Sequence, residues 1–204
     1  MNTKDRILDE ALTLFSLQGV KGTSVKDIAG AVGIKDSSLY KHFKSKREIF
    51  DTIVAKMHER IGEMSNELGM SDEEGGRLAA DFCGHLSLDE LKKLVRKTFL
   101  FYLEDDFMAR FWRVANMEQY RSPEVYDVYH RLFMEESIAY QTKLFSEMIE
   151  GGYLKAIDPA ILAVDFYAFI FFLLDKYNGR PDEKDEALAV LDRQVEEFYR
   201  VYHA

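Results

Sequence analysis

Hydrophobic residues recur at intervals of three and four along almost the whole chain, as they do on the buried face of an α-helix. The first such stretch covers residues 3–18, and Gly19 is well placed to end it. Its apolar positions are Ile7, Leu8, Ala11, Leu12 and Phe15. No stretch alternates with the period of two that a strand requires, and no internal repeat is visible. The pattern therefore predicts an all-α fold.

Two short helices are predicted next, separated by a glycine. The sequence from Ser24 to Asp27 has the form of a capping box, which predicts a helix over about residues 25–32 that ends at Gly33. A third helix is predicted over residues 36–42, with Leu39 and Phe43 facing inward. Two short helices joined by a glycine turn, with a longer helix before them, have the layout of a helix-turn-helix.

The remaining apolar pattern predicts longer helices and a loop over residues 69–76. Ser122-Pro123 and Asp158-Pro159 each place a capping side chain before a proline in the first helical position. The predicted helices cover residues 45–68, 77–85, 88–104, 107–119, 123–150, 159–177 and 183–202. The helix over 45–68 is the expected connector, because no proline-rich or low-complexity linker occurs. We expect a DNA-binding domain over residues 1–47 and a second helical domain over residues 48–204.

Composition narrows the class of protein. The chain is 47% hydrophobic and 31% charged, which is ordinary for a soluble globular protein. Its most apolar run, residues 161–174, is shorter than the roughly 20 residues that span a bilayer. Cys83 is the single cysteine, so no disulfide forms within one chain. These features predict a cytoplasmic protein without a membrane partner.

The charge is unevenly distributed. The chain carries a net charge of −9, which at first argues against a nucleic-acid partner. Residues 1–50 hold nine basic and six acidic residues, whereas residues 51–204 hold eighteen and thirty. Because DNA responds to the local surface, the positive N-terminal segment remains a candidate for binding it.

The individual residues of the N-terminal segment make the assignment more specific. They include GTSVKDIA at residues 22–29, VGI at 32–34 and SLYKHFKSKREIF at 38–50. Together with the first helix, these stretches resemble the DNA-binding domain of the TetR family over about residues 3–50. Residues 51–204 resemble the family only in length and helical character. The resemblance implies a dimeric regulator, in most cases a repressor, that binds palindromic operator DNA and is released by a small molecule.

The third helix is the candidate for reading DNA. If Leu39 and Phe43 face the core, Ser37 and Lys41 share an outer face that fits the major groove. Lys41 can reach a guanine edge or a phosphate. The residues expected to contact DNA are Thr23, Ser24, Lys35, Ser37, Ser38, Tyr40, Lys41, His42 and Lys46.

Several of these assignments concern phosphate. The resemblance implies that Tyr40 and His42 donate to phosphate oxygens, and Lys46 is placed to add charge at the start of a helix. Thr23 and Ser24 have the same expected role at the start of the second helix. The family often has Ser at the position of Lys35 and Gly at that of Ser37, so Asp36 is the alternative cap of the third helix.

The last two helices are the candidates for dimerisation. Apolar residues of the last helix follow the three–four spacing of a packed seam, and the helix before it is apolar nearly all round. The resemblance implies that these helices pair with their mates in a dimer; the alternative is that both pack inside one subunit. The expected interface residues are Phe166, Phe169, Ile170, Leu173, Leu188, Leu191, Val195 and Phe198.

The middle helices carry many aromatic and Met residues, which suit a cavity for a flat or lipophilic ligand. Phe101, Trp112 and Tyr120 are the candidate pocket residues, and a filled core is the alternative. No enzyme motif occurs, and the five histidines are not spaced as metal ligands, so we expect no enzyme activity, metal or cofactor. Two functional alternatives remain: a DNA-binding dimer without a ligand that acts as an interaction or structural protein, and an activator instead of a repressor.

Overall fold

The structure is a computed structural model that describes residues 2–70 and 77–204. Within those ranges every regular element is a helix, and the only extended pairing is an isolated bridge between Leu154 and His203. The predicted all-α fold is confirmed. Residues 71–76 of the expected loop lie outside the described residues. None of the described helices is long and apolar enough to cross a membrane.

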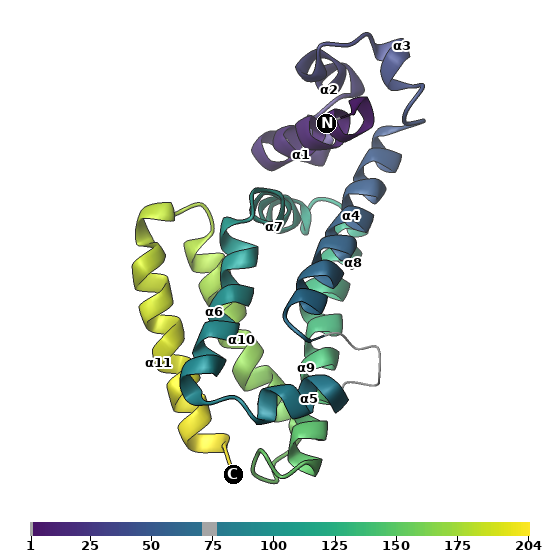
Figure 1. Cartoon of the computed structure of the whole chain (residues 1–204). Coiled ribbons are helices and arrows are strands. Elements are labelled where there is room, and N and C mark those ends of the chain that lie inside the picture. The colour runs from purple at the N-terminus through teal and green to yellow at the C-terminus, as the bar shows by residue number, and fades with distance from the viewer. Residues whose placement is uncertain (1, 71–76) are drawn as a thin grey trace. The chain divides into compact units, whose positions relative to one another are not determined.

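The helices follow the predicted order closely (Figure 1). They are α1 (Thr3–Gly22), α2 (Val25–Val32), α3 (Asp36–Leu39), α4 (Lys46–Glu67), α5 (Arg77–Gly84), α6 (Leu88–Glu104), α7 (Asp106–Glu118), α8 (Pro123–His130), α9 (Glu136–Glu150), α10 (Pro159–Tyr177) and α11 (Lys184–Tyr202). The chain forms two compact units. Unit 1 comprises Met1–Ile61 and Asp106–Tyr129, and unit 2 comprises Gly62–Asp105 and His130–Ala204.

Unit 1 has a core built from the apolar faces that the sequence pattern predicts. Ile7, Leu12 and Phe15 of α1 are buried, and α1 packs against α2 and α7. The predicted break at Gly19 is confirmed: its backbone angles, φ +81° and ψ 164°, are not helical, and a short second stretch of helix continues α1 from there to Gly22. A glycine is required there because this backbone conformation is open essentially to glycine alone.

The two short helices of unit 1 begin differently. The predicted capping box of α2 is confirmed, with Ser24 and Asp27 bonded reciprocally. The third helix is shorter than predicted: α3 ends at Leu39, and the chain continues through turns to Phe43. Asp36 is not its cap, since Lys35 occupies that position without a capping side-chain hydrogen bond.

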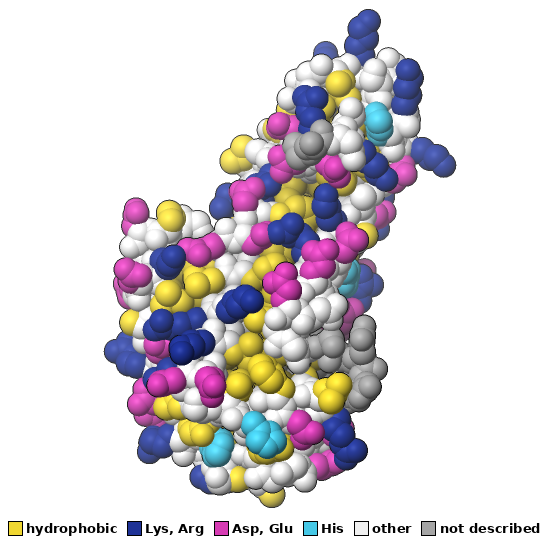
Figure 2. Space-filling model, viewed as in Figure 1, with side chains coloured by type: hydrophobic (Ala, Val, Ile, Leu, Met, Phe, Trp, Pro, Cys, Tyr) yellow, Lys and Arg dark blue, Asp and Glu magenta, His cyan; other side chains and the backbone are white. Residues whose placement is uncertain are grey.

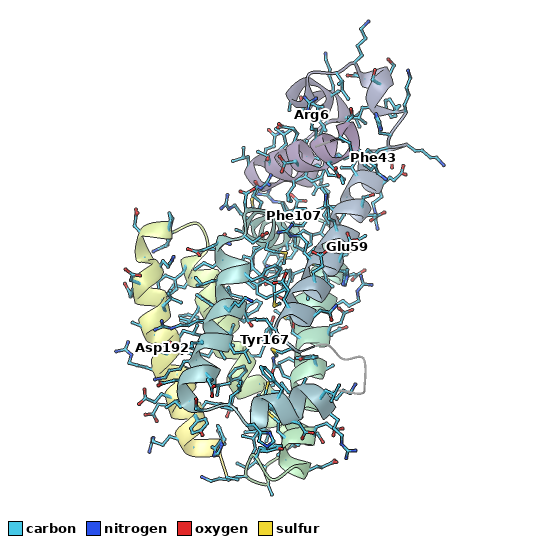
Figure 3. All side chains as sticks on the ribbon, in the orientation of Figure 1. Arg6, Phe43, Glu59, Phe107, Tyr167 and Asp192 are labelled. Atoms are coloured by element: carbon cyan, nitrogen blue, oxygen red, sulfur yellow. The ribbon has the colours of Figure 1, made fainter. Side chains whose placement is uncertain are left out.

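Unit 2 is a bundle in which α10 contacts α6, α9 and α11. Its apolar core includes Leu144, Leu162 and Phe198. Two ion pairs about one helical turn apart connect α6 to α11: Lys92 Nζ lies 2.9 Å from Glu196, and Arg96 pairs with Asp192, which Figure 3 labels. The burial of one face and the pairing of the other explain why α6 and α11 lie side by side.

The single helix predicted over residues 123–150 contains a π-helical segment, Arg131–Glu135, between α8 and α9. In such a segment the backbone bonds span five residues instead of four. The Tyr167 hydroxyl of α10 donates to the Phe133 carbonyl oxygen at 2.6 Å, and Ser137 Oγ donates to the Leu132 carbonyl at 2.9 Å. Side chains therefore bond to carbonyls in the segment where the regular helical pattern is interrupted.

Candidate DNA-binding interface

The face of α3 and the following turn that points away from the core carries polar residues. Leu39 and Phe43 are fully buried, which leaves Ser37, Lys41 and His42 exposed. Tyr40 and Lys35 are also exposed, and Ser38 is half-buried. Figure 2 shows Lys and Arg side chains projecting from the end of the chain that carries α2 and α3. The predicted DNA-contacting residues around α3 are thus accessible, Ser38 only in part.

Contacts from α1 hold this surface in place. The Arg6 guanidinium donates to the Val32 carbonyl at the end of α2, at 2.6 Å. Lys4 Nζ lies 5.4 Å from the centre of the Phe43 ring, within the range of a cation–π contact. Figure 3 labels Arg6 and Phe43 within unit 1. The orientation of α2 and α3 is therefore set by α1.

Ser24 is exposed at the start of α2 but serves first as a cap. Its hydroxyl donates to the Asp27 carboxylate at 2.7 Å, and its own N–H donates to the same oxygen at 2.8 Å. The side-chain bond from Ser24, and next the backbone bond, lower the pKa of Asp27. An anionic Asp27 stabilises the positive end of the helix dipole at this exposed position.

Thr23 does not reach the surface. Its side chain is only 1% exposed, and its hydroxyl donates to the Gly19 carbonyl at 2.9 Å while accepting a bond from Gln18 Nε2. The expected phosphate contact of Thr23 is therefore corrected: this hydroxyl stabilises the connection between α1 and α2.

Lys46 has a similar structural role. Its half-buried ammonium group donates to the carbonyl of Val20 and, at 2.6 Å, to the carbonyl of Thr23. The lysine thus joins the start of α4 to the turn before α2 instead of presenting its charge freely. The expectation that Lys46 contacts phosphate does not fit this bonding.

Several predicted dimer residues fill the core of unit 2. Leu173, Leu191, Val195 and Phe198 are buried within the single chain, and the Phe166 ring lies 5.0 Å from that of Phe198. The assignment of Leu173, Leu191, Val195 and Phe198 to an interface is corrected, because these side chains are buried inside their own unit. Phe166 is half-buried and packs against the same core. Phe169, Ile170 and Leu188 remain half-buried.

Other residues of α10 form an exposed apolar stripe that the sequence pattern did not distinguish from the buried face. The stripe consists of Ile161, Val164, Ala168 and Phe172, and Phe172 is 59% exposed. Their spacing of three, four and four places them on one side of the helix. The sequence of α10 is apolar on nearly all sides. This pattern alone does not tell which face of the helix is buried and which is exposed.

The three candidate pocket residues are divided between the two units and differ in burial. Phe101 is half-buried on α6 in unit 2 and makes an edge contact with the Tyr102 ring, at 5.3 Å. Trp112 is buried in unit 1, whereas Tyr120 is 86% exposed and lines no interior. Burial raises the pKa of Tyr102, and the nearby Tyr167 phenol raises it further. Among the described residues, no group of three or more His, Cys, Asp or Glu is placed to hold a metal.

Comparison with known proteins agrees with this architecture. Residues 7–53 match the family model of bacterial regulatory proteins of the tetR family. The Staphylococcus aureus protein IcaR, a negative transcriptional regulator of the biofilm operon icaADBC, is 30% identical over 168 residues, covering 75% of this chain and 83% of IcaR.

Solved structures share the fold over almost the whole chain. A TetR-family regulator of Mesorhizobium loti is similar with a TM-score of 0.73 and 19% identity, covering 99% of this chain and 97% of its own. SmeT, the repressor of the Stenotrophomonas maltophilia efflux pump SmeDEF, was solved with triclosan; it has a TM-score of 0.71 and 20% identity, covering 100% and 93%. The helix-turn-helix of unit 1 and the similarity to IcaR lead to one conclusion: the chain belongs to the TetR family of bacterial transcriptional regulators.

Proposed function

We propose that this protein is a repressor that binds a palindromic operator as a homodimer and is released from it by a small, largely apolar or aromatic molecule. The observation that carries the proposal is the exposed polar surface around α3. A protein that acts on an operator works in the compartment that holds the chromosome, so we place it in the cytoplasm. The name of IcaR describes a negative regulator, which supports repression over activation.

The proposed DNA contacts combine base and phosphate readers. Ser37 and Lys41 are exposed on the face opposite Leu39, where a helix in the major groove meets base edges. Tyr40 and His42 are exposed beside them and can donate to phosphates. Lys35, Ser38 and Ser24 complete the proposed set, whereas Thr23 and Lys46 are left out because their side chains bond within the chain.

The proposed dimer uses the apolar stripe of α10. Exposed apolar side chains on one helix face favour association, because their burial removes them from water. Phe172 and Ile161 would lie three turns apart along such a contact. Two copies joined in this way would carry two reading surfaces, which is the arrangement that a palindrome requires.

The proposed ligand class follows from unit 2. Half-buried aromatic side chains of α6 and α10, among them Phe101, Tyr102 and Tyr167, favour a flat apolar molecule with a polar atom that can meet a phenol. SmeT was solved with triclosan, a small aromatic compound. The second candidate function is a DNA-binding dimer without a ligand; it is favoured if the aromatic residues pack only against one another.

The test is selection of binding sites from a pool of random duplexes by the full-length protein, repeated at two salt concentrations. A recovered palindrome, bound more weakly at high salt, is the expected result. The selected duplex then serves to screen aromatic compounds for release of the protein. Recovery of no preferred sequence by a folded protein contradicts the proposed function. A palindrome that no compound releases favours the ligand-free alternative.

A further inference from the structure

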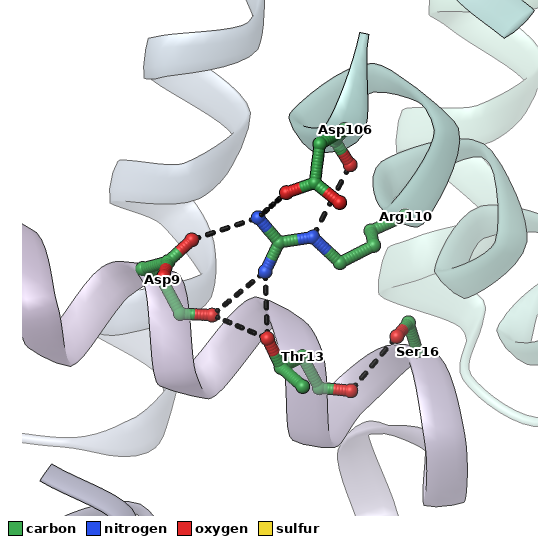
Figure 4. A network of polar contacts seen from close by, with 5 residues as sticks. All are labelled: Asp9, Thr13, Ser16, Asp106 and Arg110. Carbon is green, nitrogen blue, oxygen red and sulfur yellow. Dashed lines mark hydrogen bonds and ion pairs between the residues drawn. The ribbon is translucent and has the colours of Figure 1, made fainter. Parts of the chain in front are cut away.

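The guanidinium group of Arg110, on α7, is fully engaged by α1 and by its own helix (Figure 4). One terminal nitrogen donates to Asp9 Oδ1 at 2.7 Å and to the Asp106 carboxylate. The other donates to Thr13 Oγ1 at 2.6 Å and to the Asp9 carbonyl at 3.1 Å. Nε donates to the Asp106 carbonyl at 3.2 Å. All five N–H groups of the side chain therefore have acceptors.

This network joins a largely buried guanidinium group to two carboxylates that are more exposed, Asp9 at 45% and Asp106 at 82%. The Arg110 side chain is only 13% exposed, so water screens its charge much less than that of an exposed arginine. Its fixed planar fork matches acceptors on two helices at once, which the three N–H groups of a lysine cannot do. The position of α1 relative to α7 is thus specified by directional hydrogen bonds from Arg110 as well as by apolar packing.

A second contact holds the other end of α1. The buried Glu118 side chain, at the end of α7, lies against Gly19 so closely that a Cβ on Gly19 would be 2.2 Å from Glu118 Oε1. Lys21 Nζ donates to the carbonyl of Arg121 just beyond α7. Since both ends of the contact are fixed, α1 has little freedom to slide or turn on α7.

Further contacts connect α1 to α2, which belongs to the proposed DNA-binding surface. Arg6 lies about one turn before Asp9, which bonds Arg110, and it donates to the Val32 carbonyl at the end of α2. Lys56 of α4 reaches Asp5 on the same helix as Arg6, at 3.4 Å. α1 is therefore the part to which both the reading helices and α7 are attached.

We propose that Arg110 is a positioning residue for DNA binding, which holds α1 and the attached α2–α3 pair in the orientation that the operator requires. The DNA-binding unit then includes α7, although α7 lies far along the sequence from the helix-turn-helix. This inference rests on the proposed binding of an operator, and Arg110 itself contacts no DNA.

The experiment compares full-length wild-type protein with Arg110→Met and Arg110→Lys. Fluorescence anisotropy measures affinity for the selected operator and for a random duplex of equal length over a range of salt concentrations. We expect Arg110→Met to weaken operator binding about tenfold, within the range of typical coupling between sites. Arg110→Lys should recover only a small part of this loss. Random-duplex affinity and the salt dependence should not change, because no phosphate contact is removed.

Arg96→Met is the matched control, since Arg96 also pairs with a carboxylate on another helix, Asp192, but in unit 2. It should leave operator affinity within twofold of wild type. Thermal unfolding of each variant separates positioning from stability: a purely structural role would lower the melting temperature and leave the folded protein's operator affinity unchanged.

Asp9→Asn removes the negative charge of Asp9 but keeps the size of the side chain, so it tests the same contact from α1. This variant remains informative if Arg110→Met folds poorly. It should weaken operator binding in the same direction, and the double variant should be no weaker than Arg110→Met alone. Operator affinity within twofold of wild type for folded Arg110→Met or Asp9→Asn overturns the inference while operator binding itself stands. Absence of any preferred sequence for the wild-type protein instead removes the proposed function on which the inference rests.

Discussion

The ammonium nitrogen of Lys46 lies 2.6 Å from the carbonyl oxygen of Thr23, so a basic residue at the start of α4 bonds to its own chain. The same group donates to the Val20 carbonyl, which uses two of its three N–H groups. This lysine therefore connects α4 to the turn between α1 and α2. The positive charge of Lys46 suggests a phosphate contact. Its side chain, however, points toward two backbone carbonyls, so it serves as a structural link within the chain.

Lys46→Met and Lys41→Met should separate these two roles. Both variants should bind the operator more weakly, but only Lys41→Met should reduce the dependence of binding on salt. The expected decrease in slope is about two for a dimer, because each subunit then neutralises about one phosphate fewer. Anisotropy titrations at several salt concentrations measure it.

The stability of the two variants gives an independent check. Lys46→Met should lower the free energy of unfolding, because two carbonyls lose their charged donor. Lys41→Met should leave it unchanged, since the Lys41 side chain is exposed. A smaller salt slope for Lys46→Met would show that Lys46 leaves the turn and binds phosphate when DNA is present.

Gly19→Ala should be strongly destabilising. The residue has φ +81° and ψ 164°, a region that is essentially limited to glycine, and an added Cβ would overlap Glu118. We expect a loss of at least about 2 kcal/mol in the free energy of unfolding, measured in urea. Gly30→Ala is the control, because Gly30 is helical, exposed and has nothing within 4 Å of its added Cβ. That change should stabilise the protein by about 0.5–1 kcal/mol, and a similar result for both variants would contradict the prediction.

Phe172→Asp should convert the proposed dimer to a monomer. A carboxylate at this exposed position on the α10 stripe would lose its water on association, without a partner to compensate. Sedimentation velocity measures the change. The control is Phe82→Asp, since Phe82 of α5 is also exposed, at 42%, and lies outside the stripe. If Phe172→Asp remains a dimer, the interface lies elsewhere.

Ser24→Ala should destabilise unit 1 in a manner that depends on pH. Loss of this cap should cost about 1 kcal/mol near neutral pH. Because the bonds from Ser24 lower the pKa of Asp27, their stabilisation is present above about pH 4 and is lost as the pH falls through the lowered pKa. The difference between wild type and variant should therefore shrink at acid pH, as urea unfolding at several pH values can measure. If the difference in unfolding free energy between wild type and Ser24→Ala stays constant down to about pH 2, the stabilisation by the Ser24 cap does not depend on the charge of Asp27, which contradicts the prediction.

The sequence predicts most helices within one to three residues because apolar spacing, caps and prolines are local signals. α6, for example, covers the predicted residues 88–104, and Asp158 caps α10 as expected. Spacing does not say which partner an apolar face meets. Val195 and Phe198 have the spacing of a dimer seam, yet they pack against the core of their own unit.

The candidate DNA site was harder to predict because it depends on where side chains point. Thr23 and Ser24 are adjacent and chemically similar, but one is buried and the other exposed. Arg110 could be paired in advance only with Asp106, four residues earlier on the same helix. Its contact with Asp9, 101 positions away, arises from the tertiary fold and leaves no local trace.

The π-helical segment at Arg131–Glu135 has a consequence for how this chain tolerates changes in length. A wider turn accommodates one more residue than a regular turn, so every side chain after it is rotated by about 100°. Removal of a single residue there would leave an unbroken regular helix, but it would rotate Leu144 and Met148 away from their places in the core of unit 2. The segment therefore acts as a spacer that fixes the phase of α9, and its length matters more than the identity of its residues.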